Sequence, residues 1–156
     1  MITLLIDVVE SSGTGTPRFY RAKFDDGDND ALYYSFVMPS DATASQDLIL
    51  DIYWYSDEDV AEDVVWGVQV SATTADDADN VEEQAADTVD TVTDSADASE
   101  AKALIKATIT IDYANCDGAV AGDWVVLKFY RVGADGSDDH TNECYFVSGL
   151  LKIPRS

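Results

Sequence analysis

The stretch 47–72, DLILDIYWYSDEDVAEDVVWGVQVSA, decides the fold of this chain. Apolar residues recur at every second position over 48–54 and again over 64–70. Because successive side chains of a β-strand point to opposite faces, each run places one apolar row on a single face. The segment 56–63 between the runs is rich in Asp and Glu and cannot be buried. The stretch therefore predicts two strands joined by an exposed turn, either as a β-hairpin or as a corner between two sheets.

The same alternation predicts about eight strands in all. Beyond the central pair, strands are expected over residues 18–24, 31–38, 102–113, 124–132 and 145–153, with an opening strand near residues 2–9. Turns rich in Gly, Asp, Asn and Pro separate them, and no helix-length amphipathic pattern appears. We therefore predict an all-β fold, an antiparallel β-sandwich with a jelly-roll-like layout. A lipocalin-like barrel is the alternative, but the connection over 73–100 is long for an up-and-down meander.

The 156 residues suit one domain with a substantial core. We expect residues 1–16 to form an N-terminal strand or arm followed by a flexible linker, and residues 17–156 to form a single β-sandwich domain. The region 73–100 carries ten acidic residues and no Lys or Arg, and it is expected to be a long acidic loop. This loop is either solvated or orders against a partner.

The charge of the chain is far from balanced. Asp and Glu number 31 against 9 Lys and Arg, which gives a net charge of −22 and a pI near 4.1. Binding to DNA depends on neutralising phosphates with Lys and Arg, and anionic membranes also select basic surfaces. We therefore expect no nucleic acid and no membrane as partners. The start of the chain lacks the basic residues of a secretory signal, and no apolar run is long enough to span a bilayer.

Few residues suggest chemistry. Cys116 and Cys144 allow one disulfide but do not demand it, and free thiols are favoured because the chain is large enough to fold without one. His140 is the only histidine and follows an acidic turn, a setting typical of a solvated side chain rather than a catalytic one. The turn 25–30 is a candidate calcium site, but it lacks the ligand spacing of an EF-hand loop. We predict no catalytic residues, no cofactor and no metal site.

The three tryptophans divide into two groups. Trp54 and Trp66 lie on wholly apolar rows and are expected in the core. Trp124 shares a row with Lys128 and Tyr130, so it is the tryptophan expected to be exposed or at an interface. Exposed aromatic rings are also the platforms of carbohydrate-binding sandwiches, which keeps that function open.

Several segments together resemble small jelly-roll virion proteins of tailed bacteriophages, of the capsid-decorating or tail-associated kind. They are the segments PRFYRA (17–22), YSFVMPSD (34–41), LILDIYW (48–54), VVW (64–66) and GDWVVLKFYR (122–131). The resemblance covers most of residues 17–153, and this chain departs from it in its acidity. It implies a protein without catalytic residues that self-associates, often as a trimer, and attaches to a protein shell.

The function expected from this resemblance is that of a non-enzymatic virion structural protein. It would be a capsid decoration (cement) or tail-associated protein, located in the virion and assembled in the host cytoplasm. Its partners would be itself, as a homotrimer, and the major capsid protein or another virion protein. The alternatives are a carbohydrate-binding β-sandwich module and a surface or extracellular structural domain of a halophile. Because salt screens the repulsion between acidic subunits, self-association is expected to strengthen with ionic strength.

Overall fold

A computed structural model describes residues 6–9, 19–27, 30–43, 45–78 and 80–156. This part of the chain forms nine strands and one short 3-10 turn, η1 (Tyr113–Asn115). The strands are β1 (Ile6–Val9), β2 (Phe19–Phe24), β3 (Ala31–Val37), β4 (Leu48–Ser56), β5 (Asp63–Thr73), β6 (Asp90–Ser95), β7 (Ile105–Ile111), β8 (Trp124–Arg131) and β9 (Cys144–Lys152). None of the described helical structure has the length and apolar character that a membrane span needs.

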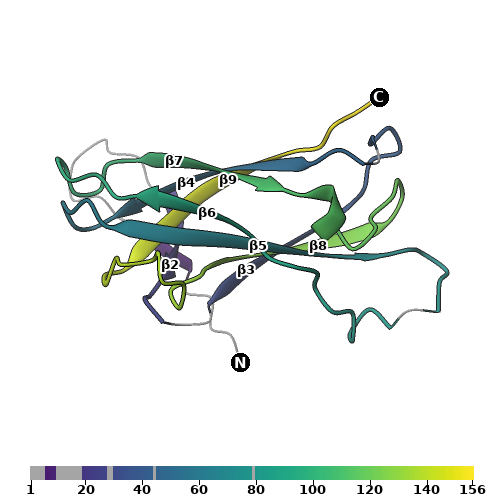
Figure 1. Ribbon diagram of the computed structural model, residues 1–156, viewed down its shortest axis with the longest axis horizontal. Helices are drawn as coiled ribbons and strands as arrows, with labels where there is room; N and C mark the ends of the chain where they lie inside the picture. Colours follow the sequence, from purple (N-terminus) through teal and green to yellow (C-terminus); the bar gives the residue numbers. More distant parts are fainter. Residues whose placement is uncertain (1–5, 10–18, 28–29, 44, 79) are drawn as a thin grey trace.

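The strands form two antiparallel sheets that stack on each other (Figure 1). One sheet has the order β1-β2-β9-β4-β7, and the other has the order β3-β8-β5-β6. Their pairing is nested along the chain: β2 with β9, β3 with β8, β4 with β7, and β5 with β6. This is the order produced when a long antiparallel ribbon wraps into two layers, which defines a jelly roll. The predicted all-β, jelly-roll-like sandwich is confirmed.

The central stretch of the sequence makes a corner rather than a hairpin. β4 lies in the first sheet between β9 and β7, whereas β5 lies in the second sheet between β8 and β6. Both strands are hydrogen-bonded to a neighbour on each side, and the acidic segment between them lets the chain cross from one layer to the other. β4 and β5 therefore lie in the interior of their sheets and not at an edge.

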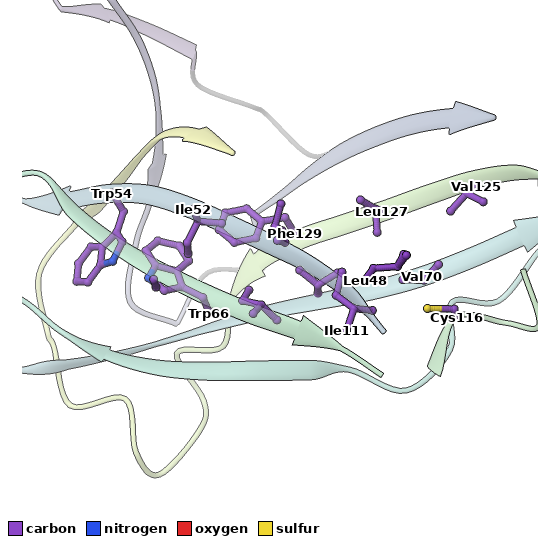
Figure 2. Packing of buried hydrophobic residues seen from close by; sticks show 14 of the residues in the cluster. Leu48, Ile52, Trp54, Trp66, Val70, Ile111, Cys116, Val125, Leu127 and Phe129 are labelled. Atoms are coloured by element: carbon purple, nitrogen blue, oxygen red, sulfur yellow. The ribbon is translucent and has the colours of Figure 1, made fainter. Parts of the chain in front are cut away.

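The core lies between the inner faces of these sheets (Figure 2). Figure 2 shows Trp54, Trp66 and Phe129 toward one end of the core and Val125 and Cys116 toward the other. Trp54 and Trp66 are fully buried, as the sequence predicts. Their ring centroids are 5.5 Å apart in an edge-on arrangement, and Trp66 stacks on Phe129 at 5.2 Å. The aromatic end of the core therefore ties β4, β5 and β8 together.

The acidic region 73–100 differs from the expected loop because it contains β6. Its strand pairs with residues 63–68 of β5, and Val92 packs against the core. Asp94 accepts a hydrogen bond from the indole Nε1 of Trp54, at 2.9 Å. Polar residues thus form a strand here because a neighbouring β5 supplies its ladder and Trp54 supplies a partner for its carboxylate. The described residues around Val81 form turns rather than a helix.

Both cysteines are free thiols inside the protein. Burial raises the pKa of the Cys116 thiol and of the Cys144 thiol to about 12. Since the thiolate is the reactive form, we expect neither cysteine to react with Ellman's reagent in the folded protein near pH 8. Both should react once urea unfolds the chain. Rapid labelling of one thiol under native conditions would contradict the buried position of that side chain.

Candidate functional site

The outer face of the β3-β8-β5-β6 sheet carries two exposed aromatic residues, Tyr33 and Trp124. Along β8, Val125, Leu127 and Phe129 point inward and are buried. The alternate residues therefore point outward, and they are Trp124, Val126, Lys128 and Tyr130. Trp124 is 39% exposed, in agreement with the sequence prediction for this tryptophan.

Strand register places two further strands beside this outward row. Trp124 lies between Val37 of β3 and Thr73 of β5. Lys128 lies between Tyr33 of β3 and Gln69 of β5. Since a strand rises about 3.3 Å per residue, these two rows are about 13 Å apart along β8. We call this surface the aromatic face; its residues are Tyr33, Ser35, Val37, Gln69, Ser71, Thr73, Trp124, Val126, Lys128 and Tyr130.

The polar groups in the middle of the aromatic face hold one another in place. Lys128 Nζ donates a hydrogen bond to Gln69 Oε1 at 3.3 Å and lies 4.5 Å from the centre of the Tyr130 ring. Gln69 Nε2 donates to the carbonyl of Asp87 at 3.0 Å. Partial burial also raises the pKa of the Tyr130 phenol, which stays protonated as a donor. The face thus offers oriented amide, ammonium and phenol groups at the end that carries Tyr33.

One end of this sheet is closed by packing at a glycine. A Cβ on Gly67 would meet Val132 Cγ2 at 2.7 Å and Val89 Cγ2 at 3.1 Å. The missing side chain lets Tyr130 and Val132 lie close over β5 at this position. The open part of the aromatic face therefore runs from Tyr130 toward Trp124.

The aromatic face contains no carboxylate, although the chain carries a net charge of −22. Its charged group is the ammonium of Lys128. The outer face of the other sheet is different, because the Asp51 carboxylate lies at its centre. Lys152 Nζ contacts Asp51 Oδ2 at 2.6 Å and Lys106 Nζ contacts it at 2.9 Å, and the hydrogen bond from Lys152 holds the pKa of the Asp51 carboxyl well below its usual range. Ion pairs therefore occupy the centre of that outer face, whereas the residues of the aromatic face form none.

Sequence reasoning found Trp124 but missed Tyr33. Tyr33 alternates along β3 with the apolar row Leu32, Tyr34 and Phe36. Tyr33 is 57% exposed and sits directly beside Lys128. The signal was the period-two pattern itself, which sends Tyr33 to the same face as Val37.

His140 is buried, so the expectation of a solvated turn histidine is wrong. Its Nε2 is 2.9 Å from Ser56 Oγ, and its Nδ1 is 3.1 Å from Glu62 Oε2. The order of groups is that of a Ser-His-acid triad. However, Ser56 and His140 are only 2% and 1% exposed, so no substrate reaches the hydroxyl. The arrangement instead fastens the β4–β5 corner to the segment before β9.

Two larger hollows in the described part of the chain are lined mostly by residues outside the aromatic face. The first, which we call the apolar groove, has a volume of about 690 Å³ and opens between β3 and the second half of β9. None of its lining residues is charged; they include Leu32, Tyr34, Phe36, Leu127, Leu151 and Ile153.

The second hollow, of about 440 Å³, is lined mainly by acidic residues, among them Asp25, Asp57 and Glu143. No group of three or more His, Cys, Asp or Glu residues in the described part of the chain is arranged to hold a metal ion. Residues 28–29 of the candidate calcium turn lie outside the described residues.

No family model matches the chain, and no curated protein matches it. The xylan-binding domain CBM22-2 of Xyn10C from Paenibacillus barcinonensis is similar in structure, with 12% identity, a TM-score of 0.47 and coverage of 97% of this chain and 88% of that one. The xylan-binding module CBM15 has 14% identity and a TM-score of 0.43, with 99% of both chains covered. CBM27-1 from Caldicellulosiruptor saccharolyticus, in complex with mannohexaose, has 8% identity and a TM-score of 0.37, covering 97% of this chain and 83% of that one. At these identities the likeness concerns the fold alone.

These similar structures are carbohydrate-binding modules, not bacteriophage virion proteins. The resemblance to virion proteins, the capsid-decorating or tail-associated function drawn from it, and the virion location are therefore wrong. The physical reason is that the resemblance rested on strand and turn patterns. Those patterns specify a jelly roll, and jelly rolls serve both viral shells and lectins.

Proposed function

We propose that this chain is a non-catalytic carbohydrate-binding module that holds a glycan chain along its aromatic face. The observation that carries the proposal is that Tyr33 and Trp124 are exposed on the carboxylate-free aromatic face of a polyanionic chain, with Lys128 and Gln69 in the same row as Tyr33. A pyranose ring presents C–H groups on its faces and hydroxyls around its rim. Aromatic faces carry negative charge density and attract such C–H groups, while amide and ammonium groups orient the hydroxyls.

The separation of the two aromatic rows suits a chain of sugars rather than a single one. The two rows are about 13 Å apart along β8, a distance longer than one pyranose ring, so one sugar cannot cover both Trp124 and Tyr33. A glycan lying along the strand can stack at both ends and contact Lys128 and Gln69 beside Tyr33. We therefore expect affinity to rise with the length of the oligosaccharide until both rings are covered.

The charge of the module favours an uncharged glycan. The potential of a chain with net charge −22 repels anionic polymers, and Lys128 alone offsets little of it. We therefore expect neutral polysaccharides to bind in preference to those rich in uronic acid or sulfate. Xylan, which one similar module binds, and mannohexaose, with which another forms a complex, are suitable members of the test panel.

The test is binding of the purified chain to a panel of neutral and anionic polysaccharides by affinity electrophoresis, followed by calorimetry with oligosaccharides. Each of Trp124→Ala and Tyr33→Ala should weaken binding about tenfold, and the double variant should abolish it. Tyr20→Ala is the matched control, because Tyr20 is an exposed tyrosine on β2 of the other sheet. Unchanged binding by the double variant, or no binding to any glycan, would contradict the proposal.

A further inference from the structure

β3 is an edge strand without the usual protection against pairing. It pairs with β8 over all seven of its residues, and no other described strand pairs with it. Its sequence, ALYYSFV, contains no charged residue and no proline, and its register with β8 shows no bulge. Charged residues, proline and bulges are the devices by which natural edge strands avoid joining another chain.

The other edge strands of the two sheets carry the charges that β3 lacks. β6, at the opposite edge of the same sheet, contains Asp90 and Asp94. β7 contains Lys106, and β1 contains Asp7. The absence of charge at β3 is therefore a feature of this edge and not of the edge strands in general.

β3 also exposes large side chains toward both of its faces. Three side chains of β3 are each more than half exposed. Tyr33 and Val37 lie on the outer face, and Tyr34 lies on the opposite face. Tyr34 and Phe36 line the apolar groove and stack on each other, with ring centroids 5.9 Å apart. An uncovered apolar row beside an open strand edge is a surface that a further strand would bury.

We propose that β3 pairs antiparallel with β3 of a second copy, so that two chains form one dimer with a continuous eight-stranded sheet. Charge restricts where a second copy can dock. Each copy carries a net charge of −22, so most contacts between copies place carboxylates against carboxylates. The edge of β3 and the apolar groove carry no acidic residue, so two copies can meet there without that repulsion.

The register of the pair follows from two-fold symmetry. A centre at Tyr34 sets Tyr34 opposite its own copy and Leu32 opposite Phe36 of the second copy. Residues directly opposite on antiparallel strands have Cβ atoms about 4.5–5.5 Å apart, so the apolar row of each copy covers the mouth of the other's groove. An isologous contact of this kind closes with two copies, in contrast to the trimer expected from the virion resemblance.

The dimer would also enlarge the proposed glycan site, and this consequence rests on the proposed function. Pairing at β3 brings the two aromatic faces to the same side of one sheet, with Tyr33 of one copy beside Ser35 of the other. A long polysaccharide could then contact both copies. The dimer itself does not depend on a glycan.

The test is the mass of the chain in solution by sedimentation velocity and light scattering, over a range of concentrations at low and high ionic strength. We expect a species of twice the 16.9 kDa chain mass that strengthens with salt, because salt shortens the repulsion between copies. Tyr34→Glu places two carboxylates opposite each other and should raise the dimer dissociation constant at least about tenfold. A chain that stays monomeric at every salt concentration, or a dimer that weakens with salt, would overturn the proposal.

Tyr20→Glu adds the same charge at an exposed tyrosine of β2 and should leave the dimer intact. Circular dichroism of both variants checks that the sandwich is folded. A dimer that survives Tyr34→Glu would place the interface elsewhere and reject the role of β3. Tyr34→Glu should retain glycan binding and Trp124→Ala should retain the dimer, so failure of one proposal can be told from failure of the other.

Discussion

Replacing Trp66 with alanine is expected to remove about 3–5 kcal/mol of the free energy of unfolding, as truncation of a buried aromatic residue does. Trp66 is fully buried and its ring contacts three others: Trp54 and Phe24 at 5.5 Å and Phe129 at 5.2 Å. These rings come from β4, β2 and β8, so the cavity would open where both sheets meet. Domains are typically stable by only about 5–15 kcal/mol, so the variant should be partly unfolded at moderate temperature. Urea unfolding followed by far-ultraviolet circular dichroism measures the loss.

Trp66→Phe gives the matched comparison. The indole Nε1 of Trp66 has no hydrogen-bond partner among the described residues, whereas that of Trp54 donates to Asp94. Phenylalanine keeps a ring to stack on Phe129 and removes the unpaired donor, so its cost should be clearly smaller than that of Trp66→Ala. Trp54→Phe loses a satisfied hydrogen bond as well and should cost about 1 kcal/mol more than Trp66→Phe. Equal losses for Trp66→Ala and Trp66→Phe would show that the ring does not fill the space described.

The strands that alternate strictly could be predicted from the sequence because one period explains both their conformation and their burial. In β4 the residues Leu48, Leu50, Ile52 and Trp54 are buried, and in β8 Val125, Leu127 and Phe129 are. The prediction that Trp124 is exposed while the other two tryptophans are buried also follows from this pattern, because Trp124 shares its row with Lys128 and Tyr130. These inferences use local pattern alone, and the pattern is set by the same burial that stabilises the sheets.

Structural features that depend on residues far apart in the sequence could not be predicted from local alternation. β6 is a strand because β5 pairs with it, and its polar sequence gives no sign of that. In β9 the register with β4 shifts between Tyr53 and Trp54, so Phe146 and Gly149 both face the groove side although they are three residues apart. The strict alternation expected of a strand over residues 145–153 fails at this bulge, because the extra residue reverses the faces. His140 was misjudged for a similar reason, since its partners lie 78 and 84 residues earlier.

The candidate site shows the same division. Trp124 and Tyr33 are each placed on an outward face by alternation, but they become neighbouring parts of one surface only through the β3–β8 pairing. The absence of carboxylates from this face cannot be predicted from the sequence, because Asp and Glu occur throughout the chain. Only the strand register determines which side chains share a face. The virion interpretation failed at this point, because it took function from the fold instead of from the chemistry of a surface.

A buried ion pair between Arg131 and Asp138 holds the turn between β8 and β9 in place. The Arg131 guanidinium and the Asp138 carboxylate are almost completely buried and form a two-pronged contact, with Nε to Oδ2 at 3.0 Å and Nη2 to Oδ1 at 2.5 Å. Arg131 also donates to the carbonyls of Asn142 and His140, and Asp138 accepts from the backbone N–H of Val65. The pair therefore joins the end of β8, the following turn and β5. Removing Asp138 leaves the buried guanidinium with only the more distant Asp26, at 3.9 Å, and removing Arg131 leaves the buried Asp138 carboxylate without its cation.

Asp138→Ala is accordingly expected to destabilise the protein by about 3–5 kcal/mol, a loss comparable to that of Trp66→Ala. Asp135→Ala is the matched control, since Asp135 is an exposed acid of the same turn and its loss should cost less than about 0.5 kcal/mol. The double variant Arg131→Met, Asp138→Ala should be more stable than Asp138→Ala alone, because it removes the stranded guanidinium. Thermal unfolding of the wild type, Asp138→Ala, Arg131→Met and the double variant gives the coupling energy between the two residues. Independent, additive effects would mean that the two side chains do not act as a pair, and the turn before β9 would then owe its position to the Ser56–His140–Glu62 contact instead.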